Sequence, residues 1–203
     1  MQLRPTYTYK TEVMDHHGLV AAISRDLGIA EKINRRIGSQ DPRRVVQPGV
    51  ACVAMIINGL GFTNRRLYLT PQFFESKSVV SLFCENITAS DLNEHCMGKA
   101  LDEIAAYGSS QLYAEIAFEI AMEQEILASS NHLDTTSFNL QGAYNHDEPS
   151  HCIEVVHGYS KDNRPDLKQV MMSLTMNGPA NIPIWMEPLS GNSSDKGKAT
   201  FFL

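Results

Sequence analysis

The chain has 203 residues, of which 43% are hydrophobic and 20% are charged, and its formal net charge is −6 at pH 7. These values are those of an average globular protein, and they exclude a disordered chain, a collagen-like fibre and a low-complexity tail. The longest stretch without charged residues, 45–64, contains polar residues, proline and glycine. It favours a buried helix over a membrane span, so we expect no membrane partner.

Charge is divided unevenly along the chain. Residues 1–70 hold ten Lys/Arg and five Asp/Glu. Residues 71–130 hold two Lys/Arg and ten Asp/Glu, and residues 131–203 hold five Lys/Arg and eight Asp/Glu. Segregated charge indicates separate working surfaces. A basic first third is compatible with a module that faces DNA.

Helical periodicity runs through the first two thirds of the chain. Apolar residues recur every four positions on both sides of Gly28, which predicts two short helices that end at Gly28 and Gly38. Ser90 and Asp91 are expected to cap a longer helix. We predict an all-helical domain over residues 1–130, with helices within 13–27, 29–37, 50–60, 71–75, 79–83, 92–107 and 109–127.

The pattern changes from helical to alternating near Asn131. Residues 133–138 are rich in β-formers, and residues 152–157 alternate between apolar and polar. Two further strands are expected on either side of a turn at Asn177, Gly178 and Pro179, within residues 170–176 and 182–189. Residues 131–203 therefore form a β-rich second domain, and the predicted fold class is α+β.

Asp134 is the candidate catalytic and metal-binding residue, because it interrupts an apolar, β-prone segment. A buried carboxylate is costly unless it is paired or binds a metal. One interpretation is an aspartate in a turn at the end of a strand. The other is a ligand of Mg²⁺, which prefers carboxylate oxygens and retains waters for substrate phosphates. Two-metal chemistry needs two or three converging acids, so Asp134 alone does not make a site.

Basic residues provide candidate DNA contacts. They occur as three arginine doublets in the helical part, at residues 35–36, 43–44 and 65–66, and in a polar loop at 157–169. The alternative is that both sets are solvated surface. If all six doublet arginines met phosphates, DNA affinity would fall with salt at a log–log slope of about −5. The DNA-binding candidates are Arg43, Arg44, Arg65, Arg66, Lys161, Arg164 and Lys168.

Histidines and cysteines carry little further signal. His146, His151, Cys152 and His157 lie near one another in sequence, but their spacing lacks the paired pattern of structural zinc sites. His17 is expected at the surface of an amphipathic helix. The four scattered cysteines and the polar first ten residues predict a cytoplasmic protein.

Six segments of the chain are informative together, through their order and their spacing. They are residues 58–62 (NGLGF), 66–69 (RLYL), 73–75 (FFE), 133–138 (LDTTSF), 158–169 (GYSKDNRPDLKQ) and 188–196 (PLSGNSSDK). Together they resemble bacterial insertion-sequence transposases of the DDE type, in the branch that carries a helical N-terminal domain of unknown function. The similarity runs from about residue 13 to residue 196.

The resemblance implies an RNase H-like catalytic domain that begins in residues 131–203. Asp134 corresponds to the first of three metal-binding acids, which hold two Mg²⁺ ions for metal-dependent DNA strand cleavage and transfer. The implied partners are the DNA ends of the mobile element and a second subunit or a full-length transposase. The helical domain is expected to recognise those ends or to pair subunits, and the protein to associate with the nucleoid.

The chain also departs from the family pattern. The family's second Asp and final Glu lie beyond the segment at 188–196, and Asp195 does not match the second catalytic position. We therefore expect an N-terminal portion of such a transposase, C-terminally truncated and inactive by itself. Two other interpretations stay open: a DNA-binding or transposase-inhibiting module without catalysis, and a decayed gene product.

Overall fold

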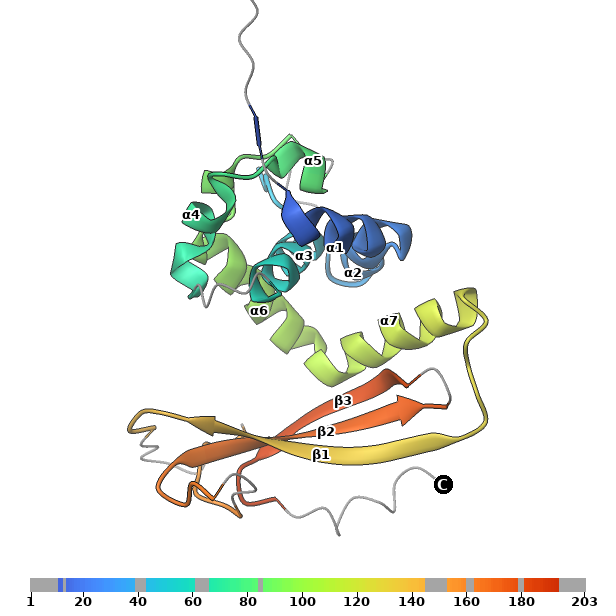
Figure 1. The fold of residues 1–203 in the computed structure, drawn as a ribbon, viewed down its shortest axis with the longest axis vertical. Helices are drawn as coiled ribbons and strands as arrows, with labels where there is room; N and C mark the ends of the chain where they lie inside the picture. Colours follow the sequence, from blue (N-terminus) through green and yellow to red (C-terminus); the bar gives the residue numbers. More distant parts are fainter. Residues whose placement is uncertain are drawn as a thin grey trace, which may run out of the picture. The chain divides into compact units, whose positions relative to one another are not determined.

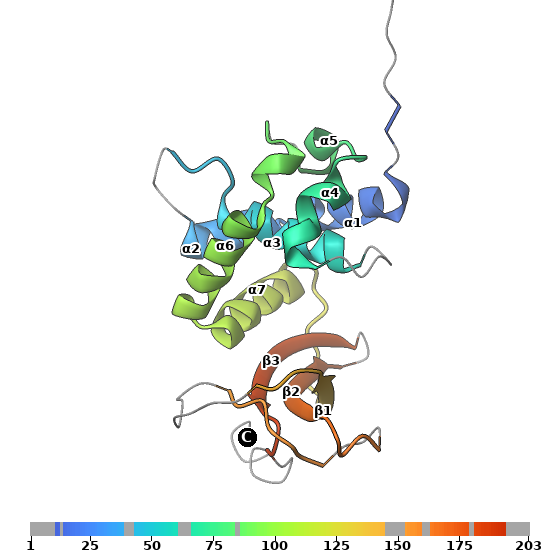
Figure 2. The same cartoon turned by 90° about the vertical axis from the view of Figure 1, so that its left-hand side faces the viewer.

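The computed structural model forms two compact units, Met1–Tyr107 and Gly108–Leu203. Among the residues that are described, the first unit is helical and the second combines one helix with a three-stranded sheet (Figures 1 and 2). The predicted α+β fold class is confirmed. The structure describes residues 11–12, 14–38, 43–60, 66–83, 86–144, 153–159, 163–178 and 181–193.

The first unit contains six α-helices in its described part and two short 3₁₀ turns. Each of the predicted helices in this part of the chain is confirmed within a few residues. The α-helices are α1 (Asp15–Asp26), α2 (Ile29–Ile37), α3 (Pro48–Gly59), α4 (Thr70–Phe74), α5 (Val79–Phe83) and α6 (Glu94–Tyr107), and the 3₁₀ turns are η1 (Leu67–Leu69) and η2 (Ala89–Asp91).

Helix α3 forms the centre of the first unit because its sequence is apolar on all sides. Ala51, Ala54 and Ile57 are fully buried, and α3 contacts α1, α2, α4 and α6. The continuous hydrophobic core extends from α3 to Phe74 and Met97. The expectation of a buried helix in this stretch is thus confirmed. No helix in the described part of the chain combines the length and the apolar character needed to cross a membrane.

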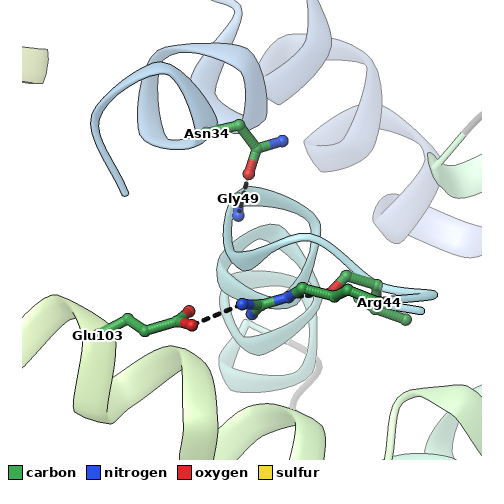
Figure 3. A network of polar contacts seen from close by, with 5 residues as sticks. Asn34, Arg44, Gly49 and Glu103 are labelled. Carbon is green, nitrogen blue, oxygen red and sulfur yellow. Dashed lines mark hydrogen bonds and ion pairs between the residues drawn. The ribbon is translucent and has the colours of Figure 1, made fainter. Parts of the chain in front are cut away.

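The start of α3 lies against the backbone of α2. A side chain at Gly49 would overlap the carbonyl oxygen of Ala30, and the Gly49 N–H donates a hydrogen bond to Oδ1 of Asn34 at 2.7 Å (Figure 3). Pro48 begins the helix, where its missing N–H costs nothing. These contacts fix the start of α3 against α2, directly after the segment that carries the arginine doublet at residues 43–44.

The glycine predicted to end α1 has that role. Gly28 adopts the left-handed conformation, with φ of 63°, and its N–H donates to the carbonyl of Arg25 at 2.9 Å. This geometry satisfies one of the last carbonyls of α1.

The predicted cap of α6 at Ser90 and Asp91 is wrong. Asp91 accepts hydrogen bonds from the N–H and the hydroxyl of Thr88, at 2.8 and 2.6 Å, and so closes a capping box around η2. Helix α6 begins three residues later, where Oδ1 of Asn93 accepts the N–H of Cys96 at 3.0 Å. The aspartate is engaged by the shorter turn, so the next polar residue caps the helix.

The second unit contains α7 (Ser109–Glu123), β1 (Asn131–Leu140), β2 (Lys168–Asn177) and β3 (Ile182–Ser190). β2 is the central strand and pairs antiparallel with β1 and β3. The predicted hairpin between the last two strands is confirmed, with Gly178 at φ of 44° in its turn.

The strand predicted at residues 152–157 is wrong in its described part. Only Val156 pairs with the sheet, through an isolated bridge to Gln169. The reason lies in the register of β2 and β3, which pair up to Val170 and Ser190. Lys168 and Gln169 therefore have no β3 partner, and the backbone of Gln169 bonds to Val156 in its place. Residue 152 lies outside the described residues.

Helix α7 packs on the sheet of its own unit. It contacts β3, and the hydroxyl of Tyr113 donates to the carbonyl of Pro183 at 2.9 Å. The sequence-based division places this helix in a domain of residues 1–130, whereas the compact units divide between Tyr107 and Gly108. Apolar periodicity shows that a helix has a face to bury, but not which element covers it.

Candidate acid site and nucleic-acid interface

Asp134 is the fourth residue of strand β1 and lies opposite Leu174 of β2. Its side chain is exposed, and its Oδ1 accepts the N–H of Thr135 at 2.8 Å. The interpretation as a turn at a strand end is therefore wrong. An exposed carboxylate in a strand avoids the cost of burial and stays available to a cation.

The face of the sheet around Asp134 mixes polar and apolar side chains. Side chains alternate between the two faces of a strand, so Asp134 shares its face with His132 and Thr136 on β1 and with Met172 and Leu174 on β2. The two β1 side chains are exposed and the two β2 side chains are half-buried. The acid thus lies between polar neighbours on its own strand and apolar ones on β2.

The carboxylate of Asp134 is a hard oxygen donor of the kind that Mg²⁺ prefers. Within the described ranges, no three His, Cys, Asp or Glu side chains come close enough together to hold a metal ion. A two-metal site needs further acids that converge on the same ions. Of the residues considered as zinc ligands, His157 is exposed, and His146, His151 and Cys152 lie outside the described residues.

The two loop segments that carry the family resemblance meet at Gln169. This side chain is 1% exposed, and its Nε2 donates to the carbonyl oxygens of Gly191 at 2.7 Å and Tyr159 at 3.2 Å. A side chain at Gly158 would overlap the carbonyl oxygen of Gly191. The sequence GYSKDNRPDLKQ is therefore constrained at its first and last residues by packing against the exit of β3. We call Gly158, Gln169 and Gly191 the glutamine clamp.

Arg44 is buried in the helical unit and is engaged there. Its side chain is 6% exposed, its Nη1 donates to Oε1 of Glu103 at 2.6 Å, and its Nε donates to the carbonyl of Val46 at 2.8 Å. Figure 3 shows the guanidinium reaching from the segment before α3 to α6. This geometry gives Arg44 a structural role, so we do not retain it as a DNA contact.

The other basic candidates differ in their environments. Arg43 and Arg66 are exposed on the helical unit. Arg164 forms a two-point ion pair with Asp166, at 2.8 and 2.7 Å, and the hydrogen bonds from Arg164 lower the pKa of that carboxyl. Lys168 donates to the carbonyl of Tyr144 at 2.8 Å. Arg65 and Lys161 lie outside the described residues.

A shallow pocket of about 260 Å³ lies between the segment before α3 and the start of α6. Arg43, His95 and Lys99 line it with exposed side chains, and Arg44 forms part of its wall. Sequence reasoning missed His95 and Lys99. Their spacing of four residues on a predicted helix was a usable signal, because it places both side chains on one face.

Part of the chain matches a known protein family. A family model described as "Domain of unknown function (DUF4277)" matches residues 9–118. The chain matches no curated protein and no solved structure. The matched segment spans the described helices of the first unit and ends inside α7, so the expectation of a helical domain of unknown function is confirmed.

Proposed function

The chain belongs to the DUF4277 family, whose model covers residues 9–118, and from this premise we propose that it acts in DNA transposition as the N-terminal part of a DDE insertion-sequence transposase. The family domain is followed by a strand that carries an exposed acid and by two further antiparallel strands. An RNase H-like domain that begins with this sheet would account for that order.

The position of Asp134 is the observation that supports this proposal most directly. The carboxylate is exposed, and it lies within a regular strand of the sheet. In this function Asp134 supplies one of the acids that hold Mg²⁺. Bound Mg²⁺ would supply the activation of a water or a 3′-hydroxyl and the neutralisation of charge on the attacked phosphate.

The helical unit would hold DNA in this function. Its exposed Arg43 and Arg66 are suited to phosphate contacts, which position a protein on DNA without reading its sequence. A second subunit or a full-length transposase would bind the same unit as a partner, and the protein would work in the cytoplasm at the nucleoid.

The test of DNA recognition is a gel-shift titration at low salt. The probe is a duplex from the DNA that flanks the gene for this chain, and a scrambled duplex of the same composition is the competitor. We expect a complex that the flanking duplex displaces more effectively than the scrambled one. Equal displacement by both would contradict recognition of element ends.

The test of the acid site uses Mn²⁺ as a paramagnetic probe in place of Mg²⁺. We expect Mn²⁺ to broaden the amide NMR signals of Leu133, Asp134 and Thr135 in the full chain, and Asp134→Asn to remove the effect. Glu154→Gln is the control, because it removes a carboxylate outside the proposed site. Broadening that survives in Asp134→Asn would contradict the role of Asp134 as a ligand.

A second candidate is a DNA-binding or transposase-inhibiting module without catalysis. It is favoured by the helical unit, which has a continuous buried core of its own. This candidate predicts specific DNA binding that Asp134→Asn leaves unchanged, together with no Mn²⁺ broadening near Asp134.

A further inference from the structure

We propose that the pocket lined by Arg43, His95 and Lys99 is the phosphate-binding site of the helical unit, and that it holds a phosphodiester group of the DNA backbone. The inference rests on the proposed DNA-binding function and deepens it by naming the site. We call this cavity the phosphate pocket.

The side chains of the phosphate pocket favour an anion. Arg43 comes from the segment before α3, and His95 and Lys99 come from successive turns at the start of α6. Of its described lining residues, Asp91 is the one acid, and that carboxylate accepts two hydrogen bonds from Thr88. The exposed lining thus brings together the cationic side chains of Arg43 and Lys99 against that single carboxylate.

The pocket is held in shape by a buried ion pair. The Arg44 side chain is 6% exposed and its Nη1 lies 2.6 Å from Oε1 of Glu103 on α6 (Figure 3). Because Arg43 is the preceding residue, this pair fixes the backbone that carries Arg43 next to the helix that carries Lys99. A phosphate-binding site whose backbone is already fixed loses less conformational entropy when the phosphate binds.

The volume of the phosphate pocket suits a single phosphate group and not a whole small molecule. Its volume is about 260 Å³, below the range of roughly 300–1,000 Å³ that is usual for pockets that enclose a drug-sized ligand. The start of a 14-residue helix lies at the same pocket and adds the positive end of its dipole. The thiol of Cys96, which also lines it, has a pKa raised by burial and so stays neutral. A phosphate group of a passing strand fits these properties.

The test measures DNA affinity against salt for the full chain, by fluorescence anisotropy of a labelled duplex with arbitrary sequence. We compare Lys99→Ala and Arg43→Ala with Arg25→Ala, a control that removes one exposed positive charge on α1. Each pocket variant is expected to lower affinity by about three- to fivefold and to reduce the log–log salt slope by about one. Lys99→Arg should restore both quantities, and Arg25→Ala should leave them near the wild-type values.

The outcomes separate this inference from the proposed function. If the wild type binds the duplex but Lys99→Ala and Arg43→Ala behave like Arg25→Ala, the phosphate pocket is overturned while DNA binding stands. If the wild type does not bind any duplex at low salt, both fail. Circular dichroism confirms that each variant is folded.

A second readout identifies the source of the phosphate. The ring signals of His95 are followed by NMR while duplex DNA or inorganic phosphate is added. A shift caused by the duplex at concentrations where inorganic phosphate has no effect supports the backbone site. A shift caused equally by inorganic phosphate, with an unchanged DNA affinity in Lys99→Ala, would overturn it in favour of a site for small anions.

Discussion

The ion pair of Arg44 and Glu103 gives the buried arginine a structural role, whereas its neighbour Arg43 is exposed. The Arg44 side chain is almost fully covered, and Glu103 is 27% exposed. Burying a guanidinium is costly without a partner, so the carboxylate is needed for the fold. A sequence contains both arginines of the doublet at residues 43–44, but only the structure separates the buried one from the exposed one.

Glu103→Gln is expected to destabilise the helical unit by about 1–3 kcal/mol, because a hydrogen bond to a charged group is lost and Arg44 remains buried. Asp102→Asn on the same helix is the matched control, since Asp102 is exposed. Urea unfolding followed by far-UV circular dichroism measures the difference. The double variant Arg44→Met/Glu103→Leu should lose less than the sum of its single changes. Strict additivity would argue that the pair is not coupled.

His17 makes the helical unit sensitive to pH. It is 4% exposed, its ring lies edge-on to Phe73 with centroids 5.2 Å apart, and its Nδ1 bonds the carbonyl of Met14 at 3.2 Å. Burial lowers the pKa of His17 below its ordinary value of 6.5, and the positive charge of Lys77 and the nearby His16 lower it further. The expectation that His17 lies at the surface is wrong, because the amphipathic pattern did not reveal the packing of its ring on Phe73.

The sign of the pH effect follows from that lowered pKa. The unfolded chain takes up a proton near pH 6.5, whereas folded His17 does not until the pH is lower. The free energy of unfolding is therefore expected to be greatest above pH 6.5 and to fall as the pH decreases toward the folded pKa. Urea titrations of the wild type and His17→Phe at several pH values measure this, with exposed His95→Asn as control. An equally steep pH dependence in His17→Phe would contradict it.

At the scale of elements, the sequence predicts the presence of helices and strands well and their neighbours poorly. Apolar spacing was enough for α3 and for the hairpin of β2 and β3, because those patterns reflect local geometry. Asn93 caps α6 where Asp91 was predicted to do so, and residues 153–157 form one isolated bridge where a strand was predicted. Both outcomes depend on which of several possible hydrogen-bond partners a side chain or a backbone group pairs with. Hydrophobic periodicity does not show this. Lys99 is a different case, because its spacing of four residues from His95 on a predicted helix was visible in the sequence.

The glutamine clamp gives a prediction about the sheet. Gly158→Ala is expected to destabilise the second unit by about 1–3 kcal/mol, because its new methyl group would overlap the carbonyl oxygen of Gly191. Trp185 on β3 is the single tryptophan of the chain, so its fluorescence during urea unfolding measures this unit. Gly98→Ala on α6 is the control, since nothing lies within 4 Å of the added methyl group. An unchanged Trp185 transition in Gly158→Ala would contradict the clamp.

At the scale of the whole molecule, the two units differ in what they bury. The continuous hydrophobic core of the described residues belongs to the helical unit. On β2, the buried face includes Gln169, Ser173, Thr175 and Asn177 beside Met171. Buried polar groups contribute less than apolar side chains of similar size, because their hydrogen bonds largely replace bonds to water. The sheet unit should therefore be the less stable of the two.

We expect two unfolding transitions in urea. Trp185 fluorescence should change at a lower urea concentration than the far-UV circular dichroism, which is dominated by the helices of the first unit. The variants already described provide the internal controls: Gly158→Ala should move only the fluorescence transition and Glu103→Gln only the circular dichroism transition. Native-state hydrogen exchange adds an independent measure, with the slowest amides expected in α3, where the residues are most completely buried. Coincident transitions that both variants shift together would contradict this prediction, because they would mean that the chain unfolds as one cooperative unit.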